Sequence, residues 1–201
     1  MFDFVYSDKK NIIKNPEKFI LFVKKLLPKY ANSLPDSAAI TLFREIKKLK
    51  KNKNNIIIET GVGASTIVMF IAAYIFKKKF YTYDINPDKM SLIRQVLNDA
   101  VCKPLKINVY DFWTYVPGNS LDQYTGIPAL KEFKNKPQFG FFDSFHTTEH
   151  LKKEVSEFMK ISTNEFVIGI DDGNHSNSKL FPLGYTNMIR QKIGLRKIKN
   201  P

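Results

Sequence analysis

The stretch "IIIETGVGASTIVMFIAAYIF", residues 56–76, decides the fold of this chain. Its β-branched start is typical of a short strand buried on both faces of a sheet. The apolar run after it is typical of a helix packed against that sheet. Between them, Gly61 and Gly63 predict a tight turn, because glycine adopts backbone conformations that other residues avoid. The stretch therefore predicts a strand, a turn and a helix, the opening unit of an α/β domain.

The same alternation continues along the chain. Further strand patterns, separated by helical ones, lie at residues 79–84, 105–111, 138–143 and 165–171. Parallel strands need such crossover connections. We predict an α/β fold: a Rossmann-like, doubly wound, mostly parallel sheet with helices on both faces. Residues 1–53 are expected to form an N-terminal helical extension, with helices near 16–27 and 36–51, and residues 54–201 the core of a single domain.

Length and composition agree with one folded domain. The chain has 201 residues, of which 43% are hydrophobic and 13% aromatic. One cysteine cannot form an internal disulfide, which suits a reducing compartment. The N-terminus lacks a signal-peptide pattern, and the longest apolar run, residues 67–76, is about half of what a membrane crossing needs. We therefore expect a cytoplasmic protein that does not enter a membrane.

The formal net charge of +13 raises the question of a nucleic-acid partner. The lysine-rich segment "REIKKLKKNKNN", residues 44–55, could attract phosphates. Lysine, asparagine and isoleucine are frequent along the whole chain, however, and no helix interleaves arginines with aromatic residues on one face. A nucleic-acid partner is disfavoured but stays open.

Acidic residues end every predicted strand, namely Glu59, Asp84, Asp111, Asp143 and the pair Asp171–Asp172. In sheets of this kind ligands bind at the carboxyl ends of the strands, so these carboxylates are expected to converge. Because like charges repel, convergent carboxylates indicate bound cations or hydroxyl-rich ligands. The alternative for "DDGN", residues 171–174, is a plain turn.

The residues around the glycine turn indicate which cofactor it binds. Asp84 follows at the end of the next strand, where an acid binds ribose hydroxyls. A dinucleotide fingerprint has a third glycine where Thr66 stands, which disfavours a nucleotide-dependent dehydrogenase. Glu59, two residues before Gly61, is unfavourable beside a pyrophosphate but favourable beside an ammonium group. S-adenosylmethionine (SAM) carries an ammonium and a ribose but no phosphate, so the turn is expected to bind it. The remaining alternative is a plain strand-to-helix turn.

Three segments together resemble class I SAM-dependent methyltransferases. They are "IIIETGVGASTIVMF…KFYTYDIN", "GFFDSFHTTEH" and "FVIGIDDGN", and the likeness covers roughly residues 36–175. Within that superfamily the chain is most similar to small-molecule O-methyltransferases of the macrolide-sugar and cephalosporin type, and more distantly to the catechol type.

The resemblance implies a role for each matching residue. Glu59, Gly61 and Gly63 would surround the methionine part of SAM, Ser65 would meet its carboxylate, Asp84 its ribose, and Asp111 or Phe112 its adenine. Asp143, Asp171 and Asp172 would hold Mg²⁺, and His146, beside Asp143 in the catalytic centre, would be the general base.

Part of the metal prediction also follows from the residues. Three carboxylates at two strand ends are the hard oxygen ligands that Mg²⁺ prefers. A hydroxyl bound to that ion loses its proton more easily, and His146 is a suitable acceptor near neutral pH. The alternative is that His146 only bonds locally at the entry of a helix. His150, one turn later, is expected on the solvated face.

We therefore expect a SAM-dependent O-methyltransferase that acts on a hydroxyl of a small molecule or sugar, with residues 54–201 as its cofactor-binding and catalytic core. The alternatives are a metal-independent methyltransferase with another acceptor such as RNA, and a catalytically silent SAM-binding regulator. The N-terminal helices are expected to cover the active site or to form a homodimer contact.

Overall fold

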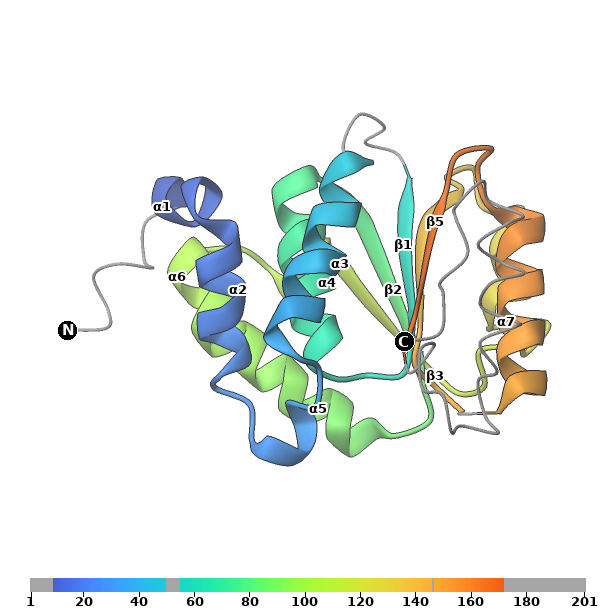
Figure 1. Cartoon of the computed structure of the whole chain (residues 1–201), viewed down its shortest axis with the longest axis horizontal. Helices are drawn as coiled ribbons and strands as arrows, with labels where there is room; N and C mark the ends of the chain where they lie inside the picture. The colour runs from blue at the N-terminus through green and yellow to red at the C-terminus, as the bar shows by residue number, and fades with distance from the viewer. Residues whose placement is uncertain (1–8, 50–54, 146, 172–201) are drawn as a thin grey trace, which may run out of the picture.

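The computed structural model describes residues 9–49, 55–145 and 147–171, and it places five parallel strands in one sheet (Figure 1). The strands are β1 (Ile56–Thr60), β2 (Lys79–Asp84), β3 (Trp113–Pro117), β4 (Pro137–Phe142) and β5 (Val167–Ile170). Their order is β3-β2-β1-β4-β5. The chain thus winds outward from β1 in both directions, and ligands bind at this switch point in such sheets.

Helices cover both faces of the sheet (Figure 1). On one face lie α1 (Lys9–Lys14), α2 (Pro16–Lys24), α3 (Asp36–Lys48), α4 (Ala64–Phe76) and α5 (Pro87–Leu97). On the other lies α7 (Thr148–Ile161), with the 3₁₀ turn η4 (Ile127–Glu132) beside it. The remaining short elements are η1 (Lys29–Ala31), the π-helical turn η2 (Asn98–Cys102), α6 (Lys103–Leu105) and η3 (Val109–Asp111). The predicted doubly wound α/β fold is confirmed.

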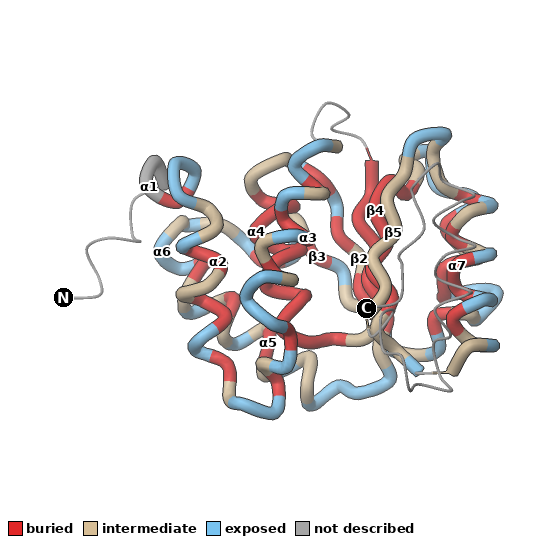
Figure 2. The backbone as a smooth tube through the Cα atoms, viewed as in Figure 1, coloured by how far each residue is buried: buried red, intermediate tan, exposed pale blue. Residues whose placement is uncertain are grey.

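The core divides into two apolar layers, one on each side of the sheet. Ile57 belongs to the layer under α4, whereas its neighbours Ile56 and Ile58 belong to the layer under α7. This alternation follows from the two-residue period of a strand. Helix α4 is buried from Ala64 to Tyr74 because the sheet covers one side, and α2, α3 and α5 cover the other (Figure 2).

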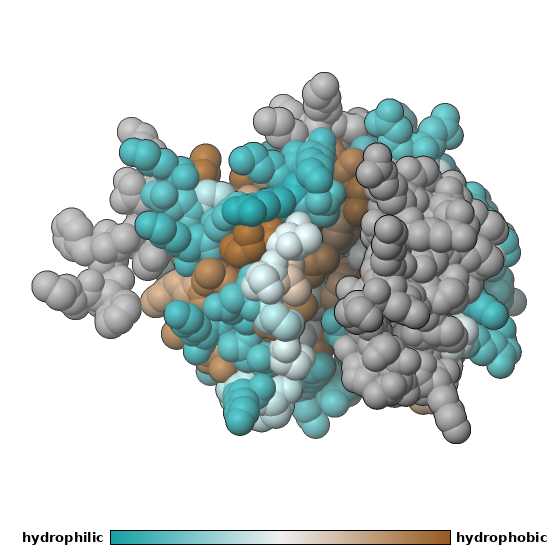
Figure 3. Space-filling view, in the orientation of Figure 1, coloured by the Kyte–Doolittle hydropathy of each residue, from teal (hydrophilic) through white to brown (hydrophobic). Residues whose placement is uncertain are grey.

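The N-terminal helices form the outer layer on the α4 side. Their outward surfaces in Figure 3 are mostly hydrophilic, with apolar side chains between them. Phe43 of α3 stacks on Phe76 of α4, with ring centroids 5.5 Å apart. Within the described ranges, no helix is long and apolar enough to cross a membrane.

The loop between α2 and α3 is held by Lys24, a lysine with almost no solvent exposure. Its Nζ donates to Asn32 Oδ1 at 2.8 Å and to the Leu34 carbonyl at 2.6 Å, and it pairs with Asp36 Oδ1 at 2.8 Å. These bonds compensate for burying the charge and fix the path of the loop.

The predicted third strand, residues 105–111, is wrong. The helical path of α5 continues through η2 and α6 and ends at Lys106, whose φ of 52° is left-handed. Asn108 then caps η3 by accepting from the Tyr110 amide at 3.0 Å. The strand itself starts at Trp113, whose ring stacks on Phe80 of β2. Because β3 ends at Pro117, the expectation of an acid at every strand end fails here.

Candidate cofactor and active site

A cavity of about 930 Å³ lies at the carboxyl ends of the five strands. Figure 1 shows these strand ends and the starts of α5 and α7 at the same, lower edge of the molecule. The cavity is lined by Ser33, Leu34, Pro35, Ala38, Gly61, Gly63, Ala64, Ser65, Tyr83, Asp84, Ile85, Lys89, Gly118, Asn119, Ser120, Asp143, Ser144, Phe145, His150 and Asp171. Six of the sequence-predicted site residues are therefore brought together here: Gly61, Gly63, Ser65, Asp84, Asp143 and Asp171.

The two glycines of the turn have different tasks. Gly61 has a φ of +87°, and a Cβ placed on it would lie 1.8 Å from the carbonyl oxygen of Asp143. Only glycine lets the turn pass this close to the end of β4. A Cβ on Gly63 would meet only the side chain of Lys89, at 3.8 Å from Nζ. Gly63 thus keeps one wall of the cavity bare.

Thr66 explains why no third glycine is needed. Its Oγ1 accepts from the Gly63 amide at 3.0 Å and donates to Glu59 Oε2 at 2.8 Å. The same carboxylate oxygen accepts from Thr82 Oγ1 at 3.0 Å, and Thr82 in turn accepts from Trp113 Nε1 at 2.9 Å. A buried network therefore runs from β3 through β2 and β1 to the turn.

Glu59 lies beneath the turn and does not line the cavity. Sequence reasoning placed it against the ligand; the structure buries it completely (0% exposed) and gives it the task of holding Thr66. Burial raises the pKa of Glu59 to about 7, although hydroxyl hydrogen bonds and the charge of Lys89 oppose that shift.

Asp84 closes the turn from the β2 side. Its Oδ2 accepts from the Val62 amide at 2.6 Å and its Oδ1 from the Asn86 amide at 2.7 Å. Asn86 also caps α5 by accepting from the Asp88 and Lys89 amides. The carboxylate of Asp84 is thereby fixed at the edge of the cavity, which Ser65 in the first turn of α4 also lines.

The predicted places of Asp111 and Phe112 are wrong. Both precede β3 and so lie at the amino end of the sheet, away from the cavity. The Asp111 carbonyl accepts from Lys79 at the start of β2, and Phe112 packs edge-on against Tyr74 of α4 with centroids 5.4 Å apart. Residues 118–120, which follow β3, line the cavity instead. The turn sequence "PGN" after the strand was the signal that could have found them.

Asp143 and Asp171 lie side by side at the ends of β4 and β5. The Asp143 amide donates to the Thr60 carbonyl at 3.0 Å, and the Asp171 amide to the Phe142 carbonyl at 3.1 Å. Burial, followed by the charges of Asp171 and Glu59, raises the pKa of Asp143. Asp172 and His146, predicted as a metal ligand and the base, lie outside the described residues. Among the residues that are described, no group of three or more acids, histidines or cysteines is placed to hold a metal ion.

Sequence reasoning missed two groups that line the cavity. Lys89, from α5, brings a cation to the glycine turn. His150, expected on the solvated face, is only 19% exposed in its side chain and contacts the buried Glu154. Since His150 and Glu154 stand four residues apart on α7, their i,i+4 spacing was the available signal.

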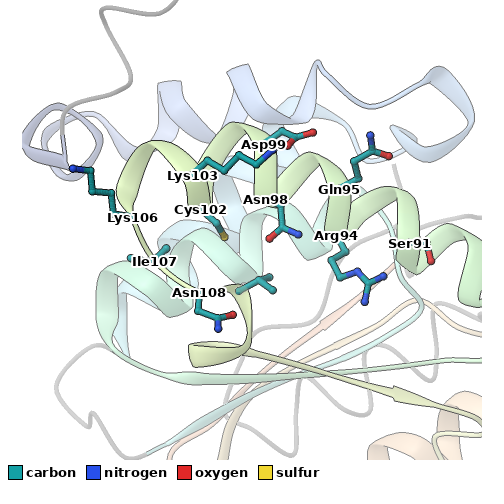
Figure 4. Close-up of a pocket in the computed structure, with 11 residues that line it drawn as sticks. Ser91, Arg94, Gln95, Asn98, Asp99, Cys102, Lys103, Lys106, Ile107 and Asn108 are labelled. Atoms are coloured by element: carbon teal, nitrogen blue, oxygen red, sulfur yellow. Dashed lines mark hydrogen bonds and ion pairs between the residues drawn. The ribbon is translucent and has the colours of Figure 1, made fainter.

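A second hollow, of about 940 Å³, lies along α5, η2 and α6 (Figure 4). Two of its basic residues have side-chain partners: Lys103 pairs with Asp99 at 2.6 Å, and Arg94 donates to Tyr110 Oη at 3.1 Å. Cys102 is buried there, which raises the pKa of its thiol to about 12. The hollow contains none of the predicted site residues and lies away from the carboxyl ends of the strands.

No family model matches the chain, and no curated protein matches it. Solved structures do match. An S-adenosylhomocysteine (SAH)-bound methyltransferase of Podospora anserina aligns with 80% of this chain at 13% identity and a TM-score of 0.55; the alignment spans 63% of that protein's length. The apo TDP-rhamnose 3'-O-methyltransferase of calicheamicin biosynthesis aligns with 92% of this chain and 86% of its own, at 14% identity and a TM-score of 0.57.

A third solved structure, an O-methyltransferase of Bacillus cereus in complex with SAH, aligns with 89% of this chain and 82% of its own. Its identity is 17% and its TM-score 0.52. At these identities the likeness establishes the fold. The fold that the resemblance to class I SAM-dependent methyltransferases implied is therefore confirmed.

Proposed function

We propose that this chain is a SAM-dependent methyltransferase whose acceptor is a hydroxyl of a small molecule or sugar. One observation carries the proposal: the glycine turn, the start of α4 and Asp84 converge on one cavity, in a fold shared with two methyltransferases solved with SAH. A methyltransferase of a sugar hydroxyl has the same fold, which supports the acceptor class.

The residues present fit the proposed cofactor. Gly63 leaves room for a ligand against the backbone, and the start of α4 offers free N–H groups beside Ser65. Asp84 is oriented to accept from ribose hydroxyls, since its two oxygens are already fixed by backbone amides. When bound, SAM supplies an electrophilic methyl group on a positively charged sulfur.

The charge of the cavity favours a cationic ligand. Asp84, Asp143 and Asp171 line it, and Glu59 lies beneath it. Burial raises the pKa values of Asp143 and Glu59, and a cationic ligand favours the ionised form of both. Lys89 offsets part of this negative charge. A sulfonium with an ammonium group is stabilised by such surroundings, whereas the pyrophosphate of a dinucleotide is repelled.

Calorimetry with the full chain tests the cofactor. We expect SAM and SAH to bind with measurable heat and NAD to give none, because the acids disfavour a pyrophosphate. Methyl transfer from radiolabelled SAM is then measured with TDP-rhamnose, catechol and total RNA as acceptors. Absence of SAM binding overturns the proposal. Binding of SAM without methyl transfer to any acceptor favours a catalytically silent regulator. Methyl transfer to RNA alone shows that the acceptor is RNA and not a hydroxyl of a small molecule or sugar.

The proposal also includes a divalent cation bound at the ends of β4 and β5. Asp143 and Asp171 are hard oxygen donors at adjacent strand ends. The pKa of Asp143 is raised first by burial and then by the charges of Asp171 and Glu59, and a cation between the two carboxylates would offset both effects. Asp172 is the predicted third ligand. When bound, Mg²⁺ makes a coordinated hydroxyl more acidic.

Mg²⁺ is expected to raise the unfolding free energy of the chain by about 2.7 kcal/mol at about 100 times its dissociation constant. The increase is expected to disappear in Asp143→Asn and Asp171→Asn, because each removes one donor. Asp99→Asn, an exposed acid paired with Lys103, is the matched control and keeps the increase. Urea unfolding with and without Mg²⁺ measures it. An equal increase in all four proteins, or none in the parent chain, contradicts a metal at this place.

A further inference from the structure

A polar cluster on the α7 side of the cavity has not entered the proposed function. Glu154 of α7 is its centre, with only 2% of its side chain exposed. One oxygen, Oε1, accepts from Ser120 Oγ at 2.5 Å and from Ser144 Oγ at 2.8 Å, and it lies 3.2 Å from His150 Nε2. Three of these four residues, Ser120, Ser144 and His150, line the cavity.

The cluster joins three segments that are far apart in the sequence. Ser120 follows β3, Ser144 follows β4, and His150 stands in the first turn of α7. A buried carboxylate needs hydrogen-bond donors to offset its lost hydration, and the three that the described residues bring to Oε1 come from the cavity wall. Glu154 therefore fixes the wall, and with it the imidazole ring.

The contacts of the ring determine which nitrogen is available. An ionised carboxylate only accepts hydrogen bonds, so a hydrogen bond between Nε2 and an ionised Glu154 places the proton on Nε2. Ser120 Oγ lies 3.4 Å from the same nitrogen, and because its own proton goes to Glu154 Oε1 it is available there as an acceptor. In the neutral imidazole Nδ1 is then a free acceptor. Within the described part of the chain, no hydrogen bond to Nδ1 is present. Phe145 packs edge-on against the ring, with centroids 5.8 Å apart.

We propose that His150, oriented by Glu154, accepts the proton of the acceptor hydroxyl in this cavity. The inference rests on the proposed function and names its base. The proton moves from the hydroxyl to Nδ1, and the oxygen keeps the electron pair with which it bonds the methyl carbon. The sulfonium sulfur leaves with the electrons of the broken S–C bond as a neutral thioether. The imidazolium is stabilised by the carboxylate of Glu154, which is a positioning residue.

Other charged groups face the same space. The cavity is also lined by Asp84 after β2, Lys89 from α5, and Asp143 and Asp171 after β4 and β5. None of them makes a hydrogen bond to the ring among the described residues, whereas Glu154 does. The sequence analysis named His146 as the general base. The variants described below distinguish His146 from His150 in this role.

The first test needs no acceptor. In the free, full-length, ¹⁵N-labelled chain, two-bond ¹H–¹⁵N spectra at alkaline pH report the tautomer of each histidine, and His150→Gln identifies the signals of His150. We expect a protonated Nε2 and a bare Nδ1, with a weaker preference in Glu154→Gln. A protonated Nδ1 with a bare Nε2 in the parent chain overturns the proposal.

The second test is kinetic, with TDP-rhamnose and catechol as acceptor probes and labelled SAM. His150→Gln is expected to lower kcat by about 100-fold and to remove the acid limb of the pH–rate profile, with a much smaller change in KM. Glu154→Gln is expected to lower kcat by about tenfold, and Glu154→Asp to recover part of the loss. Glu157→Gln, on the same helix and paired with Lys160, is the matched control and leaves both unchanged.

The outcomes are distinguishable from a failure of the proposed function. If His146→Gln removes the acid limb and His150→Gln does not, the proton belongs to His146 and the inference is overturned. If neither probe is methylated although SAM binds, the tautomer of His150 measured in the first test decides whether the inference about His150 stands. Absence of SAM binding in calorimetry overturns the proposed function itself.

Discussion

Gly61→Ala is expected to destabilise the folded chain by at least about 4 kcal/mol, which is exceptional for one methyl group. The added Cβ would lie 1.8 Å from the Asp143 carbonyl oxygen, and the φ of +87° is strained for alanine. Because the obstacle is backbone at the end of β4, no side-chain rotation relieves it. Urea unfolding of the free chain measures the loss.

Two other glycines provide the controls. Gly118 has a φ of +130° but open space around an added Cβ, so Gly118→Ala is expected to cost only the backbone strain, about 1–2 kcal/mol. Gly63 has an extended backbone, and Gly63→Ala is expected to stay within about 0.5 kcal/mol of the parent chain. Similar losses in all three variants would contradict the close approach of Gly61 to β4.

Gly63→Ala also tests the cofactor pocket independently of stability. Its methyl group would fill the space that a ligand uses to reach the backbone of the turn. An overpacked contact costs about 1–3 kcal/mol, so SAM is expected to bind about 5- to 150-fold more weakly. An unchanged dissociation constant in calorimetry would show that the ligand does not touch this wall.

Glu59 is expected to make the free chain less stable as the pH rises through neutrality. Its pKa is raised from 4.5 to about 7 in the folded chain, so between these values the folded state binds more protons than the unfolded state. The stability contributed by this group is complete below about pH 4.5 and is lost as the pH rises through about 7. The shift corresponds to about 3 kcal/mol. Asp143, whose pKa is also raised, acts in the same direction.

Glu59→Gln isolates the contribution of Glu59. The amide keeps an oxygen for Thr66 and Thr82 but does not titrate. The unfolding free energy of the parent minus that of the variant is therefore expected to be larger at pH 5 than at pH 8. The measurement is the unfolding free energy in urea across this pH range, without ligand. Glu157→Gln, at a partly exposed glutamate on α7, serves as the control. Parallel pH profiles for parent and Glu59→Gln would place the titration elsewhere.

The sequence predicted those features that follow from local pattern and from sheet topology. The apolar runs predicted β1, β2, β4 and β5, and the convergence of their carboxyl ends brought Gly61, Asp84, Asp143 and Asp171 to one cavity. These residues lie close together because the carboxyl ends of parallel strands lie at the same edge of the sheet. This arrangement follows from the topology of the sheet and does not depend on how individual side chains pack.

The failures depended on information that is not local. Residues 105–111 alternate like a strand, yet the pairing of Trp113 with Phe80 decides where β3 starts. Glu59 stands at the predicted strand end, but which layer its side chain enters depends on Thr66 and Thr82. Lys89 reaches the cavity only through the orientation of α5, which a sequence does not specify.

The hydrogen bond from Trp113 to Thr82 has a practical consequence, since this is the only tryptophan of the sequence. Indole emission depends on the polarity around the ring and on the partner of its N–H group. Thr82 donates to the same carboxylate oxygen that holds the glycine turn, so the tryptophan fluorescence of the chain originates two hydrogen bonds away from Glu59. The protein thus carries its own optical probe beneath the turn, and neither a label nor a substitution is needed to observe that place.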